Sequence, residues 1–323
     1  MTFEYSSGAF VYRKDGDGEN AKLLFLFLIK PNNDLDVPKG HVEEGENAET
    51  AARREIMEES GIEAEFIPGF MAYTAYYFYR DGKKVLKKVR YFLSKVSSSD
   101  VKISYEHKGY EWLEPAAAIR KLHYRNMKEL VAKANEYAEK HELMLKLNEE
   151  YANLPGKVEK WRLSKSFVPG EGPLDAKVFL LGQAPGLNED RLGRPFVGRS
   201  GKLLDTMILK AGLKRSKVYI ASAVQYYPPR NREPTREEIA LCRDFVSGQI
   251  EIIKPEYVVL MGNTATGSVL GFRGVETRHG EIIERNAVKY LITLHPAAVL
   301  RFKKKGKMME DDFRLLGRLL KKK

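Results

Sequence analysis

The sequence predicts a mixed fold of two domains, an α+β domain followed by an α/β domain with a mainly parallel central sheet. The chain has 323 residues, and a domain usually holds roughly 100–200 residues, so two domains are expected. In the second half, short apolar runs alternate with helical stretches, which is the pattern of parallel strands joined by helices. The first half instead mixes longer strand-like stretches with few helices.

Composition limits the class of protein. The chain is 43% hydrophobic and 11% aromatic, enough for sizeable cores. Its longest apolar run, residues 23–29, is too short to span a bilayer. The first ten residues lack a basic region followed by an apolar one, so we expect no secretory signal. The short apolar run leads us to expect no membrane partner. The single cysteine, Cys242, excludes an intramolecular disulfide and favours a cytoplasmic location.

The net charge is +11 and is unevenly distributed. Residues 301–323 contain ten lysines and arginines against three acids. Taken alone, this segment is best interpreted as a solubilising, frayed tail. Beside a base-binding pocket, a basic surface would instead suit a phosphate backbone.

In chain order, we expect strands and helices as follows. In the first half these are strands at 6–13 and 23–29, a helix at 47–60, strands at 70–79 and 87–96, and mostly helix over 115–150. In the second half the buried strands are VFLLG, VYIASAV, YVVLMG and YLITL, starting from Val178. LPG at 154–156 is a turn that marks the join. We therefore predict a first domain at 1–135, a helical linker at 136–157 and a second domain at 158–323.

A cluster of carboxylates stands out in GHVEEGENAETAARREIMEESGI, residues 40–62. On a helix from 48 to 60, Glu55, Glu58 and Glu59 fall at i, i+3 and i+4 and share one face. Their mutual repulsion would be relieved by a hard divalent cation with oxygen ligands, and Arg54 could orient one carboxylate. Gly40 and Gly45 bracket a loop whose carbonyls could complete the shell. The alternative is a solvated acidic helix face, which is the commoner reason for three such glutamates alone.

The whole stretch resembles the Nudix box. The matching positions are Gly40, Glu46, Arg54, Glu55, Ile56, Glu58, Glu59, Gly61 and Ile62. VPKGHVEEGE, the pattern K-x-V-x-Y-F-L at 87–93 and SYEHKGYEWL at 104–113 are similar to the diadenosine tetraphosphate hydrolase branch of that family. The resemblance covers about residues 5–125 and implies an α/β/α sandwich. It also implies Mg²⁺ or Mn²⁺ held by Glu55, Glu58, Glu59 and the Gly40 carbonyl, with Glu106 as a further ligand or base.

The chemistry implied is hydrolysis of a nucleoside polyphosphate. The metal would neutralise polyphosphate charge and activate water, with Glu58, Glu59 and Glu106 as catalytic candidates. Lys39 and Lys87 are candidates to hold phosphate oxygens. Tyr76, Tyr77 and Tyr110 are candidates to stack on adenine, although aromatic residues in a β-rich domain more often belong to the core.

A second constellation follows the strand VFLLG, in GQAPGLNEDRLGRPFVGRSG, residues 182–201. Glycines there let backbone N–H groups approach a ligand closely. Phe196 is available to stack on a flat polar ligand, and Glu189 and Asp190 bring carboxylates nearby. The tight turn itself carries Gln183. These features predict the floor of a base-binding pocket.

Together with SAVQYYPPRNREPTREE, VVLMGNTATGSVLG and ITLHPAAVLR, this loop resembles the uracil-DNA glycosylase superfamily, and within it family 4, over about residues 158–320. That resemblance implies an α/β/α sandwich in which Phe196 stacks on a flipped base and backbone N–H groups around Gln183 and Ala184 bind a carbonyl of the base. It implies that His295 stabilises charge on the departing base, although a lone His-Pro is more often a turn. Glu189 or Asp190 would hold the attacking water or support the sugar cation. The segment 297–301 would be a loop that wedges into the DNA, through Ala298, Val299, Leu300 and Arg301.

Three positions depart from the family 4 pattern. Its four cluster-binding cysteines align with Val158, Trp161, Tyr226 and Cys242, so we expect no iron–sulfur cluster, with Trp161 and Tyr226 filling its volume. A carboxylate in the tight turn is replaced by Gln183, as in another branch of the superfamily. The asparagine that reads the uracil edge is replaced by Ser222, which offers one hydroxyl in place of an amide.

Three interpretations of the second domain remain open at this point. It excises uracil from DNA, it excises another deaminated base such as hypoxanthine or xanthine, or it is a non-catalytic DNA-binding module. With the first domain, the predicted protein is a bifunctional enzyme of nucleotide and DNA housekeeping whose partners are nucleoside polyphosphates and DNA.

Overall fold

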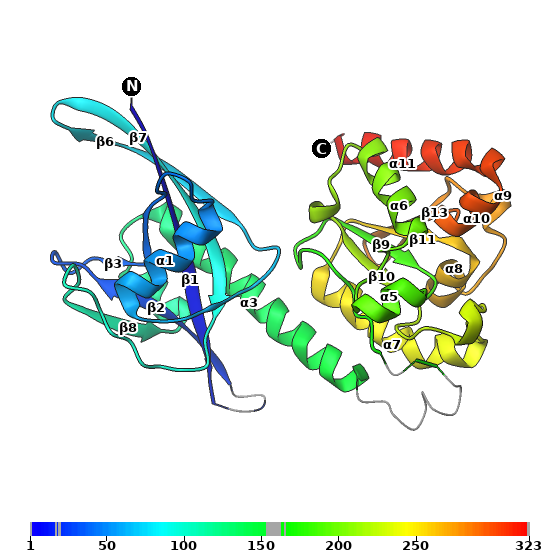
Figure 1. The fold of residues 1–323 in the computed structure, drawn as a ribbon, viewed down its shortest axis with the longest axis horizontal. Coiled ribbons are helices and arrows are strands. Elements are labelled where there is room, and N and C mark those ends of the chain that lie inside the picture. Colours follow the sequence, from blue (N-terminus) through cyan, green and yellow to red (C-terminus); the bar gives the residue numbers. More distant parts are fainter. Residues whose placement is uncertain (1, 17, 19–20, 153–162, 165, 322–323) are drawn as a thin grey trace. The chain divides into compact units, whose positions relative to one another are not determined.

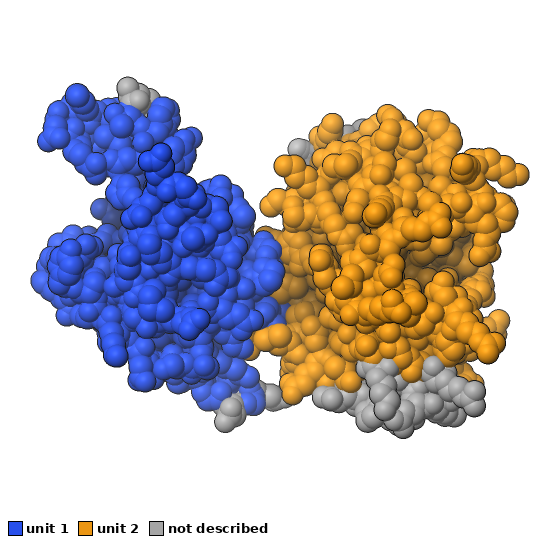
Figure 2. Space-filling view, in the orientation of Figure 1, with its two compact units in different colours: residues 1–141 blue, residues 142–323 orange. Residues whose placement is uncertain are grey.

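The computed structural model describes residues 2–16, 18, 21–152, 163–164 and 166–321. The chain divides into two compact units, Met1–His141 and Glu142–Lys323, shown in different colours in Figure 2. Helix α3 (Arg125–Ala152) occupies most of the segment predicted as a linker, and its residues are divided between the units. The predicted turn at 154–156 lies outside the described residues, and the exact domain limits stay a prediction.

Unit 1 is built on a mixed sheet. Its elements before α3 are β1 (Thr2–Asp15), β2 (Lys22–Ile29), β3 (Leu35–Asp36), β4 (Lys39–His41), α1 (Ala48–Ser60), β5 (Glu65–Phe66), β6 (Ala72–Arg80), β7 (Lys83–Lys95), β8 (Gly109–Leu113) and α2 (Pro115–Lys121). The sheet runs β3-β2-β1-β7-β5, with β4 also paired to β1, β6 to β7 and β8 to β2. Of these pairs, β1–β7 is parallel. The strands and the helix expected in this half are confirmed, whereas β8 and the short strands were not anticipated.

The two faces of this sheet are covered by different helices. Asn47 begins α1 by accepting hydrogen bonds from the backbone N–H groups of Glu49 and Thr50, and Gly61 ends it with φ +66°. From β1, Ala9 and Val11 pack in one core cluster with α1. Phe10, between them, contacts Phe70, which in turn contacts Tyr137 of α3. Because consecutive strand residues point to opposite faces, α1 and α3 lie on opposite sides of the sheet.

Unit 2 has a five-stranded sheet with helices around it (Figure 1). Its elements are β9 (Val178–Gly182), α5 (Leu187–Leu192), α6 (Arg199–Lys210), η2 (Arg215–Lys217), β10 (Tyr219–Ser222), η3 (Pro229–Asn231), α7 (Arg236–Ile253), β11 (Tyr257–Met261), α8 (Gly262–Leu270), α9 (Val275–Arg278), β12 (Ile282–Arg285), β13 (Val288–Thr293), α10 (Pro296–Arg301), η4 (Lys303–Lys305) and α11 (Gly306–Lys321). The order is β10-β9-β11-β13-β12, and only β12 pairs antiparallel. The predicted mainly parallel sheet is confirmed.

Parallel pairing brings the carboxyl ends of β9, β10, β11 and β13 to one edge of the sheet. Ligands of open α/β sheets bind at that edge. The loops that carry the predicted base-binding residues leave from it. In the described part of the chain, no helix has the length and apolar character needed to cross a membrane.

The basic C-terminal segment is a packed helix over most of its length. Met309, Phe313 and Leu316 of α11 are buried. The buried Asp312 accepts hydrogen bonds from Thr293 Oγ1 at 2.6 Å and from His279 Nδ1 at 3.0 Å. The interpretation as a frayed tail is therefore wrong for residues 306–321, because the apolar spacing of this segment buries one side of it.

Candidate active sites

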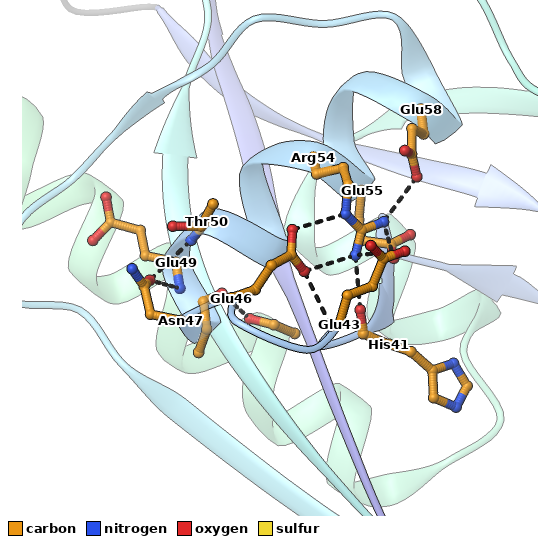
Figure 3. A network of polar contacts seen from close by, with 11 residues as sticks. His41, Glu43, Glu46, Asn47, Glu49, Thr50, Arg54, Glu55 and Glu58 are labelled. Carbon is orange, nitrogen blue, oxygen red and sulfur yellow. Dashed lines mark hydrogen bonds and ion pairs between the residues drawn. The ribbon is translucent and has the colours of Figure 1, made fainter.

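Arg54 is the centre of a polar network in unit 1 (Figure 3). Its Nε and Nη2 each donate to the Glu46 carboxylate at 3.0 Å, and Nη1 donates to Glu55 at 2.8 Å and Glu58 at 2.9 Å. Nη2 also donates to the carbonyl of His41 at 2.8 Å. These carboxylates raise the pKa of Arg54. Arg54 thus connects α1 to His41 and Glu46, which precede the helix, and it holds the carboxylates of Glu55 and Glu58 in place.

Gly40 allows β4 to approach α1 closely. A Cβ atom built on Gly40 would lie 2.0 Å from Oε1 of Glu55, so no other residue fits without displacing that carboxylate. Burial raises the pKa of Glu55, and it raises the pKa of Glu59 to about 7 although the Lys39 backbone N–H donates to Glu59 at 2.9 Å. A buried and a half-buried carboxylate that resist ionisation form a place where a cation would lower the electrostatic cost of their negative charges.

The residues of this region suit a hard cation. Glu55, Glu58, Glu59 and the Gly40 carbonyl offer only oxygen donors, as Mg²⁺ or Mn²⁺ prefers. Across the described residues, no three His, Cys, Asp or Glu side chains already converge as a metal site, since Arg54 engages Glu55 and Glu58. Glu106 lies exposed in the turn before β8. Its role and those of the other ligands stay predictions.

The predicted phosphate-binding lysines, Lys39 of β4 and Lys87 of β7, lie near one another on the side of the sheet to which Tyr76 of β6 points. Lys87 is opposite Tyr76 in the β6–β7 pairing and opposite Glu4 in the β1–β7 pairing. Burial lowers the pKa of Lys87, and the charge of Lys39 lowers it further. Lys39 itself forms an ion pair with the buried Asp36. A half-buried ammonium group beside a second cation is a favourable place for a phosphate oxygen.

The sequence analysis did not identify Asp36. Its position three residues before Lys39 could have indicated an ion pair between the two side chains. Asp36 also pairs with Lys30. Among the predicted stacking residues, Tyr76 and Tyr110 are 40% and 39% exposed. Tyr110 is opposite Leu28 of β2, which packs with α1, so the register points Tyr110 to the side of the sheet away from Tyr76. Tyr77 follows Tyr76 directly on β6 and therefore points to the opposite face of the sheet. It cannot line the same pocket.

In unit 2, the ring of Phe196 packs onto the end of β9. A Cβ atom on Gly182 would lie 2.4 Å from Cζ of Phe196, and one on Gly201 would lie 1.8 Å from the Phe196 carbonyl oxygen. Phe196 is 7% exposed and has φ +52°, which is uncommon for a bulky residue. Arg215 donates to the carbonyls of Phe196 at 3.2 Å and Pro195 at 2.8 Å. These contacts maintain the unusual backbone and fix the ring.

Glu189 ties the two arms of this loop together. Its carboxylate accepts from the backbone N–H groups of Gly186 at 3.1 Å, Val197 at 2.9 Å and Gly198 at 2.7 Å. Asp190, beside it, accepts a hydrogen bond from Ser164 Oγ. Both carboxylates therefore accept hydrogen bonds from the protein. Those of Glu189 hold the loop in its conformation. That either residue holds the attacking water stays a prediction.

His295 lies across from Phe196, between β13 and α10. Its Nδ1 accepts a hydrogen bond from Ala297 N at 3.1 Å, so the neutral ring carries its proton on Nε2. Nε2 is buried and has no hydrogen-bond partner among the described residues. The two rings have centroids 5.8 Å apart. Burial lowers the pKa of His295 to about 4. A neutral imidazole with an unused N–H donor thus lies beside the ring of Phe196.

Gln183 and Ala184 follow β9 directly and form the predicted tight turn. Thr264 Oγ1 lies 3.1 Å from Oε1 of Gln183 and 3.2 Å from Oε1 of Glu233. A hydroxyl donates only one hydrogen bond at a time, so Thr264 donates either to the amide oxygen of Gln183 or to the carboxylate of Glu233. Thr264 and Glu233 were not singled out at the sequence level. Both residues lie in motifs that the sequence analysis quoted without assigning roles to single residues: Thr264 in GNTATG and Glu233 in PPRNREP.

Ser222 ends β10 opposite Gly182 and is 5% exposed, so it lies beside the Phe196 platform. Its carbonyl accepts from Gln225 Nε2 at 2.6 Å. The Oε1 atom of Gln225 is buried without a hydrogen-bond partner in the described part of the chain. A polar amide that sequence reasoning missed therefore lies close to Ser222, the position predicted to replace the base-reading asparagine.

The predicted wedge segment is helical, which corrects the expectation of a loop. Residues Pro296–Arg301 form α10, with Val299 buried and Leu300 39% exposed. Val299 therefore packs inward, because one side of this short helix faces the core. Ala298 is half-buried, and Leu300 and Arg301 are the exposed members of the predicted wedge.

Two of the positions aligned with cluster cysteines are described. Tyr226 is 2% exposed, its ring lies 5.6 Å from that of Phe167, and its hydroxyl donates to the Tyr151 carbonyl at 2.5 Å. Burial raises the pKa of the Cys242 thiol to about 11, so it stays protonated and packs as an apolar group. Val158 and Trp161 lie outside the described residues. At the Tyr226 position, the buried space is filled by the packed rings of Tyr226 and Phe167.

Comparison with known proteins gives a separate match for each half. Residues 4–134 match the NUDIX domain, and residues 169–317 match the uracil DNA glycosylase superfamily. A type-4 uracil-DNA glycosylase of Archaeoglobus fulgidus is 37% identical over 176 residues, which is 52% of this chain and 88% of that protein.

For the first half, the asymmetrical bis(5'-nucleosyl)-tetraphosphatase of Caenorhabditis elegans is 34% identical over 131 residues, which is 40% of this chain and 91% of that protein. A crystal structure of a C. elegans Ap4A hydrolase binary complex is 30% identical, with 42% of this chain and 98% of that chain covered and a TM-score of 0.37.

Proposed function

We propose that this chain, which belongs to the Nudix family through residues 4–134 and to the uracil-DNA glycosylase superfamily through residues 169–317, is a bifunctional housekeeping enzyme. Its first unit hydrolyses a nucleoside polyphosphate of the diadenosine tetraphosphate type. Its second unit excises uracil from DNA. The similarity to a tetraphosphatase and to type-4 glycosylases supports this assignment.

For hydrolysis, the close approach of Gly40 to Glu55 is the observation that carries the proposal. Glu55, Glu58, Glu59 and the Gly40 carbonyl would hold Mg²⁺ or Mn²⁺, with Glu106 as a further ligand or base. A bound divalent ion supplies neutralisation of phosphate charge and activation of water.

The chain's own residues bind and orient the substrate. Arg54 holds the carboxylates of Glu55 and Glu58 in place. Lys39 and Lys87 bind phosphate oxygens, and Tyr76, on the same side of the sheet as Lys87, stacks on the nucleotide base. This division of roles follows from the half-buried lysines and from the exposure of the Tyr76 ring.

For excision, the unused Nε2–H of His295 beside Phe196 is the observation that carries the proposal. A base rotated out of the DNA stacks on Phe196, and backbone N–H groups around Gln183 and Ala184 bind one of its carbonyls. Nε2–H donates to a base oxygen as the glycosidic bond breaks and its electron pair moves onto the base. Water oxygen then adds to the sugar C1', and the proton it loses neutralises the departing base.

Ser222 favours a second candidate, excision of another deaminated base. A hydroxyl cannot present the paired donor and acceptor of an amide, so hypoxanthine or xanthine would be rejected less strongly than by asparagine. A non-catalytic DNA-binding module is the third candidate. His295 argues against it, because a buried donor without a partner lowers stability unless a ligand uses it.

The excision assay compares oligonucleotides that carry one uracil, hypoxanthine or xanthine, as single strands and opposite guanine, with abasic sites as the readout. We expect wild type to excise uracil and His295→Ala to lose at least about a hundredfold in rate, as for removal of a single transition-state donor. His123→Ala, an exposed histidine of unit 1, is the control and should match wild type. Excision indifferent to His295 would overturn the assigned pocket. Binding without excision would favour the module.

Hydrolysis is tested separately with diadenosine tetraphosphate and Mg²⁺. Glu59→Gln should abolish turnover, because the amide is a much weaker ligand for a hard cation. Glu49→Gln changes an exposed glutamate of the same helix that pairs with Arg53, and it should retain turnover. Equal activity of both variants would contradict the metal assignment.

A further inference from the structure

One face of the β1–β6–β7 part of unit 1 gathers exposed aromatic rings and basic side chains. The face is defined by Phe3, Tyr5, Tyr73, Tyr77, Tyr79, Lys84, Lys88 and Arg90. The register places Tyr5 opposite Lys88, Tyr73 opposite Arg90 and Tyr79 opposite Lys84. Directly paired residues point to the same side of a sheet, so these side chains share one surface. In Figure 1, β6 and the adjoining part of β7 lie at the upper left, near the N-terminus where β1 begins.

The rings of this aromatic–basic face are unusually open to solvent. Phe3 is 51% exposed, Tyr5 57%, Tyr73 59%, Tyr77 54% and Tyr79 72%. Along β6, Tyr77 and Tyr79 are two residues and roughly 7 Å apart, and Tyr73 precedes Tyr77 by four residues with Ala75 between them. Aromatic side chains normally lose most of their exposure on folding, and clustered exposed ones mark an interaction site.

Each cation of the face lies near a ring and has no carboxylate partner in the part of the chain that the structure describes. Lys84 Nζ is 4.2 Å from the centroid of Tyr77, Lys88 Nζ is 5.5 Å from Phe3, and the Arg90 guanidinium is 5.3 Å from Tyr73. No ion pair of these three cations is found among the described residues. Glu4, between Phe3 and Tyr5, points to the other face, where it pairs with Arg80 and His41.

The face differs from the proposed nucleotide site. Tyr76 and Lys87 alternate with the face residues along β6 and β7, so they point to the opposite side of the sheet. Besides the rings and cations, Ala75 and Leu86 contribute to the face, and no acid of these three strands does. A ligand of this surface must be negatively charged and must offer flat groups that stack.

We propose that the aromatic–basic face binds single-stranded DNA. Unpaired bases stack on the tyrosine and phenylalanine rings, and Lys84, Lys88 and Arg90 contact backbone phosphates, the combination found in single-strand binding surfaces. A duplex hides the faces of its bases, so the single strand is the form that uses these rings. The choice of DNA over RNA rests on the proposed excision of uracil from DNA by the same chain.

The test measures fluorescence anisotropy of a labelled, uracil-free 20-nucleotide DNA strand with the full chain. The double variant Tyr73→Ala/Tyr77→Ala should weaken binding at least about tenfold, because stacking on each ring is lost. Tyr73→Phe/Tyr77→Phe should bind like wild type, since it keeps the rings. Lys84→Glu/Lys88→Glu should weaken binding and reduce the salt slope by about 1.4, from roughly 0.7 per phosphate contact.

Matched controls use residues away from the face. Tyr105→Ala removes a tyrosine that is 96% exposed in a loop, and Lys14→Glu reverses a charge at the other end of β1. Both should bind like wild type. Retained nucleotide hydrolysis in every variant shows that unit 1 is folded. Affinity and salt slope unchanged in the ring and charge variants would overturn the proposal.

Three other outcomes also overturn it. Tighter binding of the matching RNA strand through the same residues assigns the face to RNA. Loss of binding to vesicles of anionic lipid in the same variants assigns it to a membrane, and a dimer of wild type that these variants dissociate assigns it to a second copy of the chain. Excision from a short uracil substrate is assayed in parallel. Its failure with strand binding intact contradicts the proposed function alone, and the reverse result contradicts only this face.

Discussion

At the scale of single residues, one backbone hydrogen bond sets the chemistry of His295. Because Nδ1 accepts from Ala297 N, the proton of the neutral ring lies on Nε2, which is buried beside Phe196. Protonation of the ring would break that hydrogen bond and place a charge in a buried site. Both effects favour the neutral form, in agreement with a pKa lowered to about 4.

We therefore predict that excision does not titrate near pH 6.5. Between about 4, the pKa in the folded protein, and the ordinary value of 6.5, His295 stays neutral and keeps its Nε2–H donor. The single-turnover rate at saturating enzyme should be flat from pH 8 to pH 5.5 and fall as the pH approaches 4. An inflection near pH 6.5 that disappears in His295→Ala would contradict this.

The same shift affects stability with a defined sign. The unfolded chain binds a proton at His295 below about pH 6.5 whereas the folded chain does not, so the contribution of this residue is complete above pH 6.5. It is lost as the pH falls towards 4, by on the order of 3 kcal/mol at most. Denaturant unfolding at pH 7.5 and 4.5 should show a smaller decrease for His295→Gln than for wild type.

Ser222 is the second residue with a separable effect. If it occupies the base-reading position, Ser222→Asn should restore a paired donor and acceptor, and a mismatched base would then leave a buried amide unpaired at a cost of about 1–3 kcal/mol. The rate ratio of uracil to hypoxanthine should rise about tenfold, measured as abasic sites on matched strands. Ser222→Ala, which adds no amide, should not raise the ratio. An unchanged ratio in a folded Ser222→Asn protein would remove Ser222 from the pocket wall.

At the scale of elements, the approach of β4 to α1 builds the site of unit 1. Asn47 and Gly61 set the start and the end of α1, and this places Arg54, Glu55 and Glu58 together on the helix. Strand β4 pairs with β1 in a register that puts Gly40 opposite Ser7, and Ser7 Oγ donates to the carbonyl of Ala48 at the start of α1. The strand pairing and this hydrogen bond together fix the approach of Gly40 to Glu55, which the short loop between β4 and α1 would not do alone.

Gly40→Ala should separate activity from stability. Its Cβ would overlap the Glu55 carboxylate, whose closest atom is 2.0 Å away, but that is the free end of a flexible side chain. We expect nucleotide hydrolysis to fall at least about a hundredfold while the free energy of unfolding drops by less than about 1 kcal/mol. Gly109→Ala is the control, since its Cβ meets only Ile29 at 3.5 Å. Equal turnover in both variants would show that the position of the Glu55 carboxylate does not matter.

At the scale of the whole molecule, each site belongs to one unit. The residues around Arg54 lie within Met1–His141, and Phe196, Ser222 and His295 lie within Glu142–Lys323. Each unit also has its own sheet and its own buried core. A folded scaffold of this kind can support its chemistry without residues from the other unit.

We predict that the two activities are independent in the full chain. Glu59→Gln should abolish nucleotide hydrolysis and leave the excision rate within about twofold of wild type, a change below 0.5 kcal/mol. His295→Ala should do the reverse. Both activities are measured on the same preparations, and an excision rate that drops with Glu59→Gln would reveal coupling between the units.

Much of this organisation could be read from the sequence, because it depends on local order along the chain. The helix spacing of Glu55, Glu58 and Glu59 places them on one face wherever α1 lies, and short apolar runs separated by helices specify a parallel sheet. The loop after β9 was identified from its glycines and Phe196. Motifs of both families span short segments, so the family of each half was also accessible.

Contacts between distant segments were decided only by tertiary structure. Phe196 and His295 meet because β9 and β13 flank β11 in one sheet, a pairing that no local pattern specifies. The C-terminal segment is a helix because burial of its apolar side outweighs its repelling charges. Which tyrosines of β6 face the nucleotide site and which form the aromatic–basic face depends on register, where a shift of one residue exchanges the two faces. The hydrophobic effect depends on which apolar surfaces are removed from water, whatever their separation along the chain. These contacts and faces are therefore defined only in the folded molecule.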